Sequence, residues 1–180
     1  MITVKLLIIF LAVTINSMAG NDNTVKTVSN VDLQKYTGNW YEIAKIPNSF
    51  QKDCVSDTTA SYELRDDGKI RIINKCMDKD GGLRDVDGIA KVVDKDTNAR
   101  LKVSFFSILG WHIFWGDYWI IGLGNDYEYA IVGHPKRTYG WILSRTKKLS
   151  EDKMNEIFSK LENNGYDTFS FEFTKQDTSN

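Results

Sequence analysis

The sequence predicts an all-β protein: an eight-stranded antiparallel up-and-down β-barrel with one C-terminal α-helix packed outside it. Three observations support this fold class. Short segments in which apolar and polar residues alternate follow one another between turn signals. The chain has 13 glycines, two prolines and 12% aromatic residues, which suits strands joined by tight turns. A helical period appears only after the last barrel strand, from Ser150 onward.

The first 19 residues are expected to form a secretory signal peptide. Lys5 precedes the apolar run 6–15, and Ser17 and Ala19 form a small-x-small site after which we expect cleavage. The run is shorter than the ~20 apolar residues of a membrane span, and an uncleaved anchor is the alternative. No cysteine lies at the expected cleavage site, since the first cysteine of the chain is Cys54, so we expect no lipid-modified residue at that site. We therefore expect an exported protein, periplasmic or secreted, with association with the outer membrane as one option.

The rest of the chain is expected to hold one domain. Residues 20–30 are polar and predict a flexible arm. A barrel domain over 31–175 follows, opening with a helical turn at 31–36, and 176–180 form a tail.

Strand signals recur at regular intervals through this domain. The first strand contains Trp40, and in the next, 59–64, Ala60, Tyr62 and Leu64 share one face. The run 65–68 (Arg-Asp-Asp-Gly) is a strong hairpin signal. The remaining strands are predicted over 69–76, 84–93, 101–105, 118–123, 127–133 and 139–145.

The C-terminal segment predicts a helix and a last short strand. Ser150 suits the N-cap and Gly165 the end of the helix. Its apolar positions are spaced by three and four residues, so they should lie against the outside of the barrel. Alternating phenylalanines then predict the strand. These two sets are Met154, Ile157, Phe158 and Leu161, and Phe169, Phe171 and Phe173.

Charge and cysteine content narrow the function. The 23 basic and 24 acidic residues nearly cancel, which argues against nucleic acid as a partner because phosphates require a basic surface. Cys54 and Cys76 are the only cysteines, and they lie eleven residues before and eleven residues after Arg65, where the predicted turn begins. Export makes a disulfide between them the expected state, with two free thiols as the alternative.

Three motifs follow one another along the chain: Gly38-Asn39-Trp40-Tyr41-Glu42, Asn125-Asp126-Tyr127-Glu128-Tyr129-Ala130-Ile131-Val132 and Trp141-Ile142-Leu143-Ser144-Arg145. Together they resemble the motifs of the lipocalins. The segments 38–47, 101–106, 116–119 and 139–146 are similar to those of one group within that family, the bacterial outer-membrane lipocalins, plant temperature-induced lipocalins and apolipoprotein D. The resemblance spans about 31–173.

The resemblance implies a carrier and not an enzyme. Gly38, Trp40 and Arg145 would be structural, with the arginine laid across the indole at the closed end, a contact worth ~1–2 kcal/mol. The implied ligand is a fatty acid, a lysophospholipid or a similar hydrophobic molecule, held for membrane lipid maintenance or storage. We expect a monomer or a homodimer.

Inward-facing residues are the candidate ligand contacts. An eight-stranded barrel can be hollow or filled, so the alternative for each is simple core packing. The candidates are Tyr62, Val86, Val103, Phe105, Tyr118, Ile120 and Trp141.

The connection between 105 and 119 is unusually apolar for a loop. We expect it, through Trp111, Phe114 and Trp115, to form a hydrophobic lid or to enter a lipid surface. The alternatives are an inward plug of the mouth and a longer strand.

No catalytic, metal or cofactor site is predicted. His112 and His134 are the only histidines and have no partner at metal-ligand spacing. The sequence has no nucleophile elbow, phosphate loop or Cys-x-x-Cys motif. Two competing hypotheses remain: an enzyme with this architecture, and a filled barrel that acts as a surface interaction module.

Overall fold

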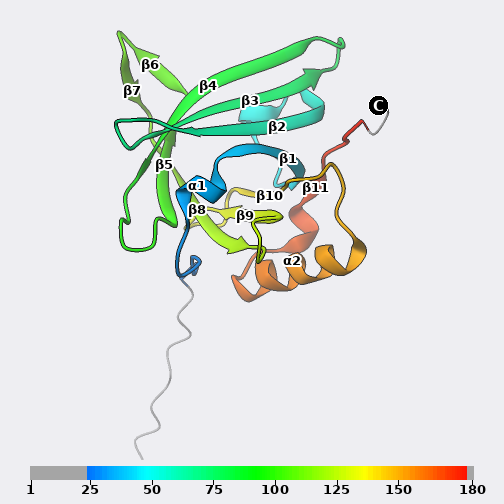
Figure 1. Ribbon diagram of the computed structural model, residues 1–180. Coiled ribbons are helices and arrows are strands. Elements are labelled where there is room, and N and C mark those ends of the chain that lie inside the picture. Colours follow the sequence, from blue (N-terminus) through cyan, green and yellow to red (C-terminus); the bar gives the residue numbers. More distant parts are fainter. Residues whose placement is uncertain (1–23, 178–180) are drawn as a thin grey trace, which may run out of the picture.

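The computed structural model describes residues 24–177 (Figure 1). The predicted signal peptide therefore lies outside the described residues. The elements in chain order are α1 (Leu33–Tyr36), β1 (Gly38–Lys45), η1 (Ser49–Gln51), β2 (Cys54–Leu64), β3 (Ile70–Asp78), β4 (Leu83–Val92), β5 (Arg100–Ser104), β6 (Phe106–Ile108), β7 (Trp111–Ile113), β8 (Gly116–Leu123), β9 (Tyr129–Gly133), β10 (Gly140–Ser144), α2 (Glu151–Asn163), η2 (Thr168–Ser170) and β11 (Glu172–Phe173).

Eight antiparallel strands close into a barrel, as the sequence predicts. Each barrel strand pairs with its neighbours in chain order, from β1 through β5 and then β8 to β10. The barrel closes where β10 pairs back onto β1, with Tyr41 opposite Ser144 and Lys45 opposite Trp141. Closure removes the free sheet edges that would otherwise pair with other chains.

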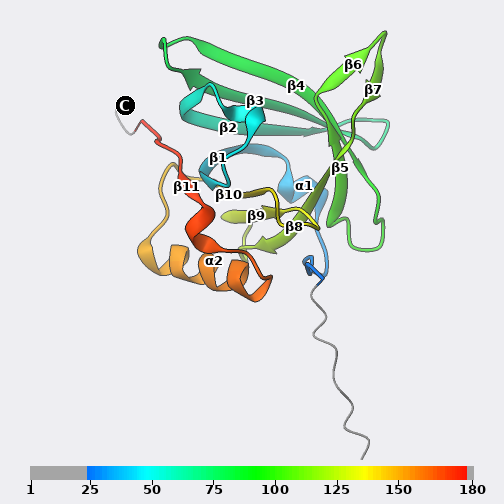
Figure 2. The same cartoon turned by 180° about the vertical axis from the view of Figure 1, so that it is seen from behind.

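The helix α2 lies across the outside of the barrel, over β8, β9 and β10 (Figures 1 and 2). Ser150 caps it, its side chain accepting a hydrogen bond from the backbone N–H of Lys153. Gly165 follows the helix at φ +75°, a conformation that glycine adopts without strain. Ile157 and Leu161 are fully buried against outward-facing residues of the barrel, among them Tyr129, Ile131 and Ile142. Each such side chain contributes ~1.5–3 kcal/mol of hydrophobic stabilisation.

The segment after α2 differs from the predicted strand. Residues 168–170 form the 3-10 turn η2, and only Glu172 and Phe173 pair with β1. The Asp167 side chain accepts a hydrogen bond from the backbone N–H of Phe169 and so begins a turn where the alternation predicts extended chain. Phe171 is buried, whereas Phe169 and Phe173 are exposed.

The two ends of the described chain also lie on the barrel. Val25 is buried against α2 and its neighbours, and the N–H of Val28 donates to the carbonyl of Ile120 (3.0 Å). Within the stretch predicted as a flexible arm, Val25 therefore buries its side chain and Val28 buries part of its own, while residues 20–23 lie outside the described residues. Gln176, expected in the tail, donates hydrogen bonds to the carbonyls of Glu42 and Thr58.

The predicted disulfide joins Cys54 on β2 to Cys76 on β3, with Cα atoms 5.6 Å apart. The two cysteines are not directly opposite: Cys54 pairs with Asp78, two positions beyond Cys76. Two register shifts in β2, between Cys54 and Thr59, bring Cys54 closer to Cys76 than an unbroken ladder would.

The apolar connection after β5 forms a separate hairpin, β6–β7, that projects from one end of the barrel (Figure 1). Its register continues that of the β5–β8 pair, with Phe106 opposite Ile113 just as Val103 is opposite Gly116. The connection therefore lengthens these two strands beyond an interruption at 104–105 and 114–115, as the longer-strand alternative predicts. Within residues 24–177, no helix has the length and apolar character needed to cross a bilayer.

Candidate ligand cavity

The closed end of the barrel is sealed by Trp40 and Arg145. Trp40 is fully buried, and the Arg145 guanidinium lies 3.6 Å from its ring centroid. The guanidinium also donates to the carbonyls of Lys35, Thr37 and Asn39 at 2.7–2.9 Å. It therefore fixes the end of α1 and the start of β1 at once, by cation–π attraction and by hydrogen bonds.

Gly38 belongs to the same structure. Its φ of +91° is strained for a residue with a Cβ, and a Cβ there would lie 3.4 Å from the arginine Nη1.

Above this seal lies a layer of packed side chains, and above the layer the barrel is hollow. Tyr36, Ile70, Leu101 and Ile120 are buried in one cluster with Trp40. The cavity beyond has a volume of about 840 Å³, large enough for a lipid-sized ligand. Its apolar walls come from Ala60, Tyr62, Ile72, Val86, Val103, Phe105, Phe106, Phe114, Tyr118, Val132, Tyr139, Trp141 and Leu143.

The structure brings most of the predicted contact residues together around this space. Tyr62, Val86, Val103, Phe105, Tyr118 and Trp141 all line it. Ile120 faces inward as predicted but lies in the packed layer, fully buried and outside the lining.

A chain of three tyrosine hydroxyls marks the border between the cavity and the packed layer. Tyr118 Oη lies 2.7 Å from Tyr36 Oη and 2.9 Å from Tyr62 Oη. Burial raises the pKa of Tyr62 to about 12 and raises the pKa values of Tyr36 and Tyr118 well above the usual value. All three phenols are therefore neutral hydrogen-bond donors across the physiological pH range.

A second polar group is built around Glu42, which is only 3% exposed and lines the cavity. Its carboxylate accepts hydrogen bonds from Lys45 Nζ (3.1 Å), Gln51 Nε2 (2.6 Å) and Thr174 Oγ1 (2.6 Å). Gln51 Oε1 in turn accepts a hydrogen bond from Trp141 Nε1 at 2.9 Å. This network holds the Trp141 indole in place along the cavity wall.

Several residues of the cavity lining were not predicted from the sequence. Glu42 is two residues after Trp40 on β1, so the alternation along this strand places both side chains on the inner face. It was interpreted only as part of the family motif and not as a lining residue. Phe50 and Gln51 come from the η1 turn, and Asn74 from β3. Phe50 and Gln51 belong to a turn, where no alternation of apolar and polar residues predicts which side chains point inward. Asn74 lies on a strand, so its place in the alternation was a signal that could have predicted it.

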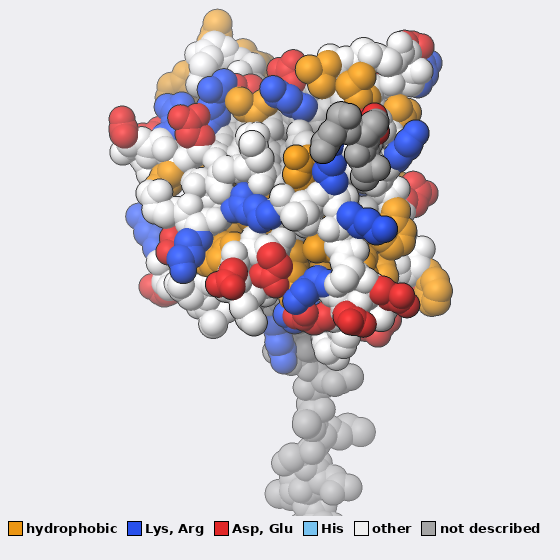
Figure 3. All heavy atoms as spheres, turned by 45° about the vertical axis from the view of Figure 1, so that its right-hand side comes forward, with side chains coloured by type: hydrophobic (Ala, Val, Ile, Leu, Met, Phe, Trp, Pro, Cys, Tyr) orange, Lys and Arg blue, Asp and Glu red, His pale blue; other side chains and the backbone are white. Residues whose placement is uncertain are grey.

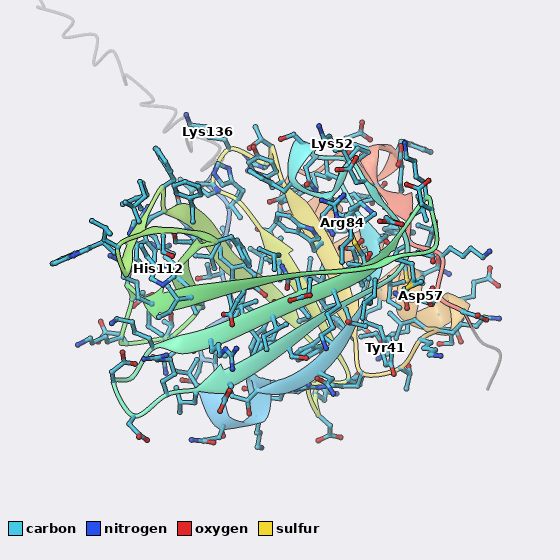
Figure 4. All side chains as sticks on the ribbon, turned by 90° about the horizontal axis from the view of Figure 1, so that it is seen from above. Tyr41, Lys52, Asp57, Arg84, His112 and Lys136 are labelled. Atoms are coloured by element: carbon cyan, nitrogen blue, oxygen red, sulfur yellow. A yellow bond between two sulfur atoms is a disulfide. The ribbon has the colours of Figure 1, made fainter. Side chains whose placement is uncertain are left out.

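Charged residues at the rim are mostly paired. Arg84 Nη1 lies 3.0 Å from Asp53 Oδ2, and Lys102 Nζ lies 3.0 Å from Asp117 Oδ1. In the view from above, Arg84 and His112 lie on opposite sides of the molecule (Figure 4). On the face in Figure 3, acidic and basic side chains are interspersed, so no patch of one sign gathers there to attract a charged macromolecule.

The β6–β7 hairpin exposes a set of large apolar side chains beside the cavity. Leu109 is 95% exposed, Trp111 78% and Phe114 80%. Phe114 also lines the cavity and packs against Phe106, with ring centroids 5.8 Å apart. Trp115 is instead held within the hairpin, where its Nε1 donates to the His112 carbonyl (3.2 Å) and Lys91 Nζ lies over its ring.

The histidines lie apart from each other. His134 lines the cavity, and burial lowers its pKa below the usual value. Among residues 24–177, no group of three His, Cys, Asp or Glu side chains is arranged to hold a metal ion.

The sequence is similar to those of known proteins. Residues 31–176 match the family model of the lipocalin-like domain. The outer membrane lipoprotein Blc of Escherichia coli K12 is 38% identical over 153 residues, which cover 84% of this chain and 83% of that protein. Temperature-induced lipocalin-1 of Arabidopsis thaliana is 36% identical over 155 residues, with 84% and 83% coverage.

A solved structure agrees in fold. Insecticyanin from the tobacco hornworm Manduca sexta superposes with a TM-score of 0.68, at 23% identity, over 86% of this chain and 85% of that one. At this identity the likeness concerns the barrel alone.

Proposed function

This chain belongs to the lipocalin family, and on that premise we propose that it binds one hydrophobic ligand per barrel and carries or stores it without catalysis. The ligand class we propose is a fatty acid, a lysophospholipid or a similar molecule with one long apolar chain. The observation that carries the proposal is the cavity of about 840 Å³ with its largely apolar wall.

The energetics of burial support this ligand class. Moving a methylene group from water into an apolar cavity contributes ~0.8 kcal/mol. A long acyl chain therefore reaches micromolar affinity or better after the entropic cost of binding, even without polar contacts. Membrane lipid maintenance or storage is the biological role that such a carrier would serve.

Export is part of the same proposal. Lys5 and the apolar run 6–15 have the form of a signal peptide, and the Cys54–Cys76 disulfide suits an oxidising compartment. We therefore propose a periplasmic or secreted location. Blc of Escherichia coli is named an outer membrane lipoprotein, whereas the first cysteine after the apolar run of the present chain is Cys54, which is in the disulfide.

The ligand test is extraction of lipid from protein purified without detergent, followed by mass spectrometry. We expect one hydrophobic molecule per chain, displaceable by a fluorescent fatty acid. If native mass spectrometry shows an empty barrel and the fluorescent fatty acid fails to bind, the carrier function is wrong and the interaction-module hypothesis gains.

An enzyme with this barrel needs a reactive group facing the ligand. Both thiols are in the disulfide, which leaves the Glu42 carboxylate as the buried acid in the wall. That carboxylate already has three hydrogen-bond donors. Recovery of the bound ligand chemically unchanged after long incubation supports a carrier, and a modified product supports an enzyme.

The exposed hairpin supports a second proposal, contact with a lipid surface at the cavity mouth. Leu109, Trp111 and Phe114 project into solvent beside the lining residues Phe105 and Phe106. Exposed apolar patches of this kind mark contact sites, and an aromatic hairpin suits the membrane interface. Ligand could then move between bilayer and cavity without crossing water.

Liposome flotation tests this second proposal. We expect wild-type protein to float with vesicles and the Trp111→Ser/Phe114→Ser variant to float several-fold less. Phe169→Ser is the matched control, because Phe169 is 97% exposed but lies in η2, after α2. Equal flotation of all three proteins would remove the membrane role.

A further inference from the structure

The three tyrosine hydroxyls at the inner end of the cavity have one more O–H donor than the hydrogen bonds among them require. Three hydroxyl groups carry three protons, and the chain makes two hydrogen bonds, Tyr36–Tyr118 and Tyr118–Tyr62. One phenol in this chain therefore has an O–H group without a partner among the described residues. The position of that spare donor decides what the cavity can recognise.

In the favoured arrangements the spare proton belongs to a tyrosine that lines the cavity. If Tyr62 donates to Tyr118 and Tyr118 to Tyr36, the unpaired proton falls on Tyr36, which is 2% exposed and does not line the cavity. A buried donor without a partner is destabilising, so this arrangement is disfavoured. The other arrangements place the proton on Tyr62 or Tyr118, and both of these line the cavity.

The charged residues around this donor determine whether an ionised or a neutral oxygen of a ligand is favoured as its acceptor. The cations of the lining are Lys75 and Arg84; Lys75 is exposed on β3, and Arg84 pairs with Asp53 at the rim. The buried carboxylate of Glu42 lies on the cavity wall, paired with Lys45, and the charges of Glu42 and Arg145 act on the pKa of Tyr62 in opposite directions. The Arg145 guanidinium lies behind the Trp40 ring and is already bound to backbone carbonyls, so the lining offers an ionised group of the ligand no free cation at the inner end and burial of a carboxylate there is unfavourable.

We propose that Tyr62 and Tyr118, with Tyr36 behind them, form a donor site for a neutral oxygen at the end of the ligand that enters the cavity first. The ligands favoured are hydrophobic molecules with a hydroxyl or keto oxygen at that end, such as acyl chains oxygenated near the terminal methyl. This inference rests on the proposed carrier function and narrows its ligand class. Without the donor, a hydroxyl at the buried end of a ligand would weaken binding, because it would be desolvated without a partner.

The test compares hexadecanoic acid with 16-hydroxyhexadecanoic acid by displacement of a fluorescent fatty acid. In the wild-type protein we expect the hydroxy acid to bind at least as tightly as its parent. The Tyr62→Phe/Tyr118→Phe variant removes both lining hydroxyls, and we expect it to bind the hydroxy acid about three- to tenfold more weakly, with the parent unchanged. Tyr139→Phe is the control, since Tyr139 lines the cavity outside the hydroxyl chain.

The outcomes separate the two proposals. If the double variant keeps the wild-type ratio of the two affinities, the donor site is wrong while the carrier function stands. If neither acid binds the wild-type protein, the carrier function fails and the donor site falls with it.

A second measurement needs no variant and covers the case in which the double variant misfolds. In wild-type protein labelled with ¹³Cζ-tyrosine, the hydroxy acid should shift the Tyr62 and Tyr118 resonances and the parent acid should not. Identical spectra with the two ligands would overturn the donor site.

Discussion

At the scale of single residues, Tyr62 links stability to alkaline pH. Its pKa is about 12 in the folded protein, where the hydroxyl stays neutral, whereas an unfolded tyrosine ionises near its ordinary pKa of 10.0. As pH rises, the unfolded state therefore releases this proton before the folded state does. The contribution of the neutral Tyr62 hydroxyl to the free energy of unfolding is complete below pH 10 and is lost as pH rises toward 12. We expect the free energy of unfolding to fall by about 1 kcal/mol between pH 9 and pH 11 through Tyr62 alone.

The measurement is urea unfolding at both pH values for wild type and Tyr62→Phe. Other buried tyrosines, Tyr36 and Tyr118, also titrate above their usual range, so the informative quantity is the difference between the two proteins. The phenylalanine variant should lose about 1 kcal/mol less over this interval. A pH dependence that is the same in both proteins would show that Tyr62 titrates normally.

At the scale of elements, α2 is held to the barrel by a narrow apolar stripe. Leu161 is fully buried in it, and Leu161→Ala should lower the free energy of unfolding by about 2–5 kcal/mol through lost burial and the cavity left behind. The matched control is Leu109→Ala in the hairpin, which makes the same change at a residue that is 95% exposed. There the expected loss is below about 0.5 kcal/mol. Denaturant unfolding checks both, and equal losses would mean that α2 adds little to stability.

The elements show which kind of structure could be predicted from the sequence. The barrel strands and α2 have clear periods, and their caps are local, so Ser150 and Gly165 mark the helix ends correctly. Residues 168–173 alternate like a strand, yet Asp167 starts a turn and leaves Phe169 in solvent. A side-chain hydrogen bond to the backbone outweighed the pattern there, and no apolar periodicity records such a bond.

At the scale of the whole molecule, the barrel could be predicted and its interior only in part. The ordered motifs around Trp40 and Arg145 indicated the family, and the matches over 31–176 confirm it. Inward parity also placed Val103 and Trp141 on the cavity wall. The alternation along a strand predicts which side chains point inward, but not whether they lie in the packed layer or around the cavity. Ile120 points inward as predicted, yet it lies in the packed layer below the cavity. That boundary depends on side chains from many strands meeting in space, which no local pattern encodes.

The disulfide ties two strands of this hollow barrel together, and both cysteines line the cavity. Fewer inward side chains fill this half of the barrel than the closed half, so a covalent link replaces part of the missing packing. Closing a loop of about 20 residues stabilises a fold by about 3 kcal/mol in the chain-entropy model.

We expect reduction with dithiothreitol to lower the free energy of unfolding by about that amount and to weaken ligand binding, measured by urea unfolding and by displacement. Cys54→Ala/Cys76→Ala should respond to the reductant in neither assay. A wild-type protein equally stable in both redox states would mean that β2 and β3 hold the mouth without the bond.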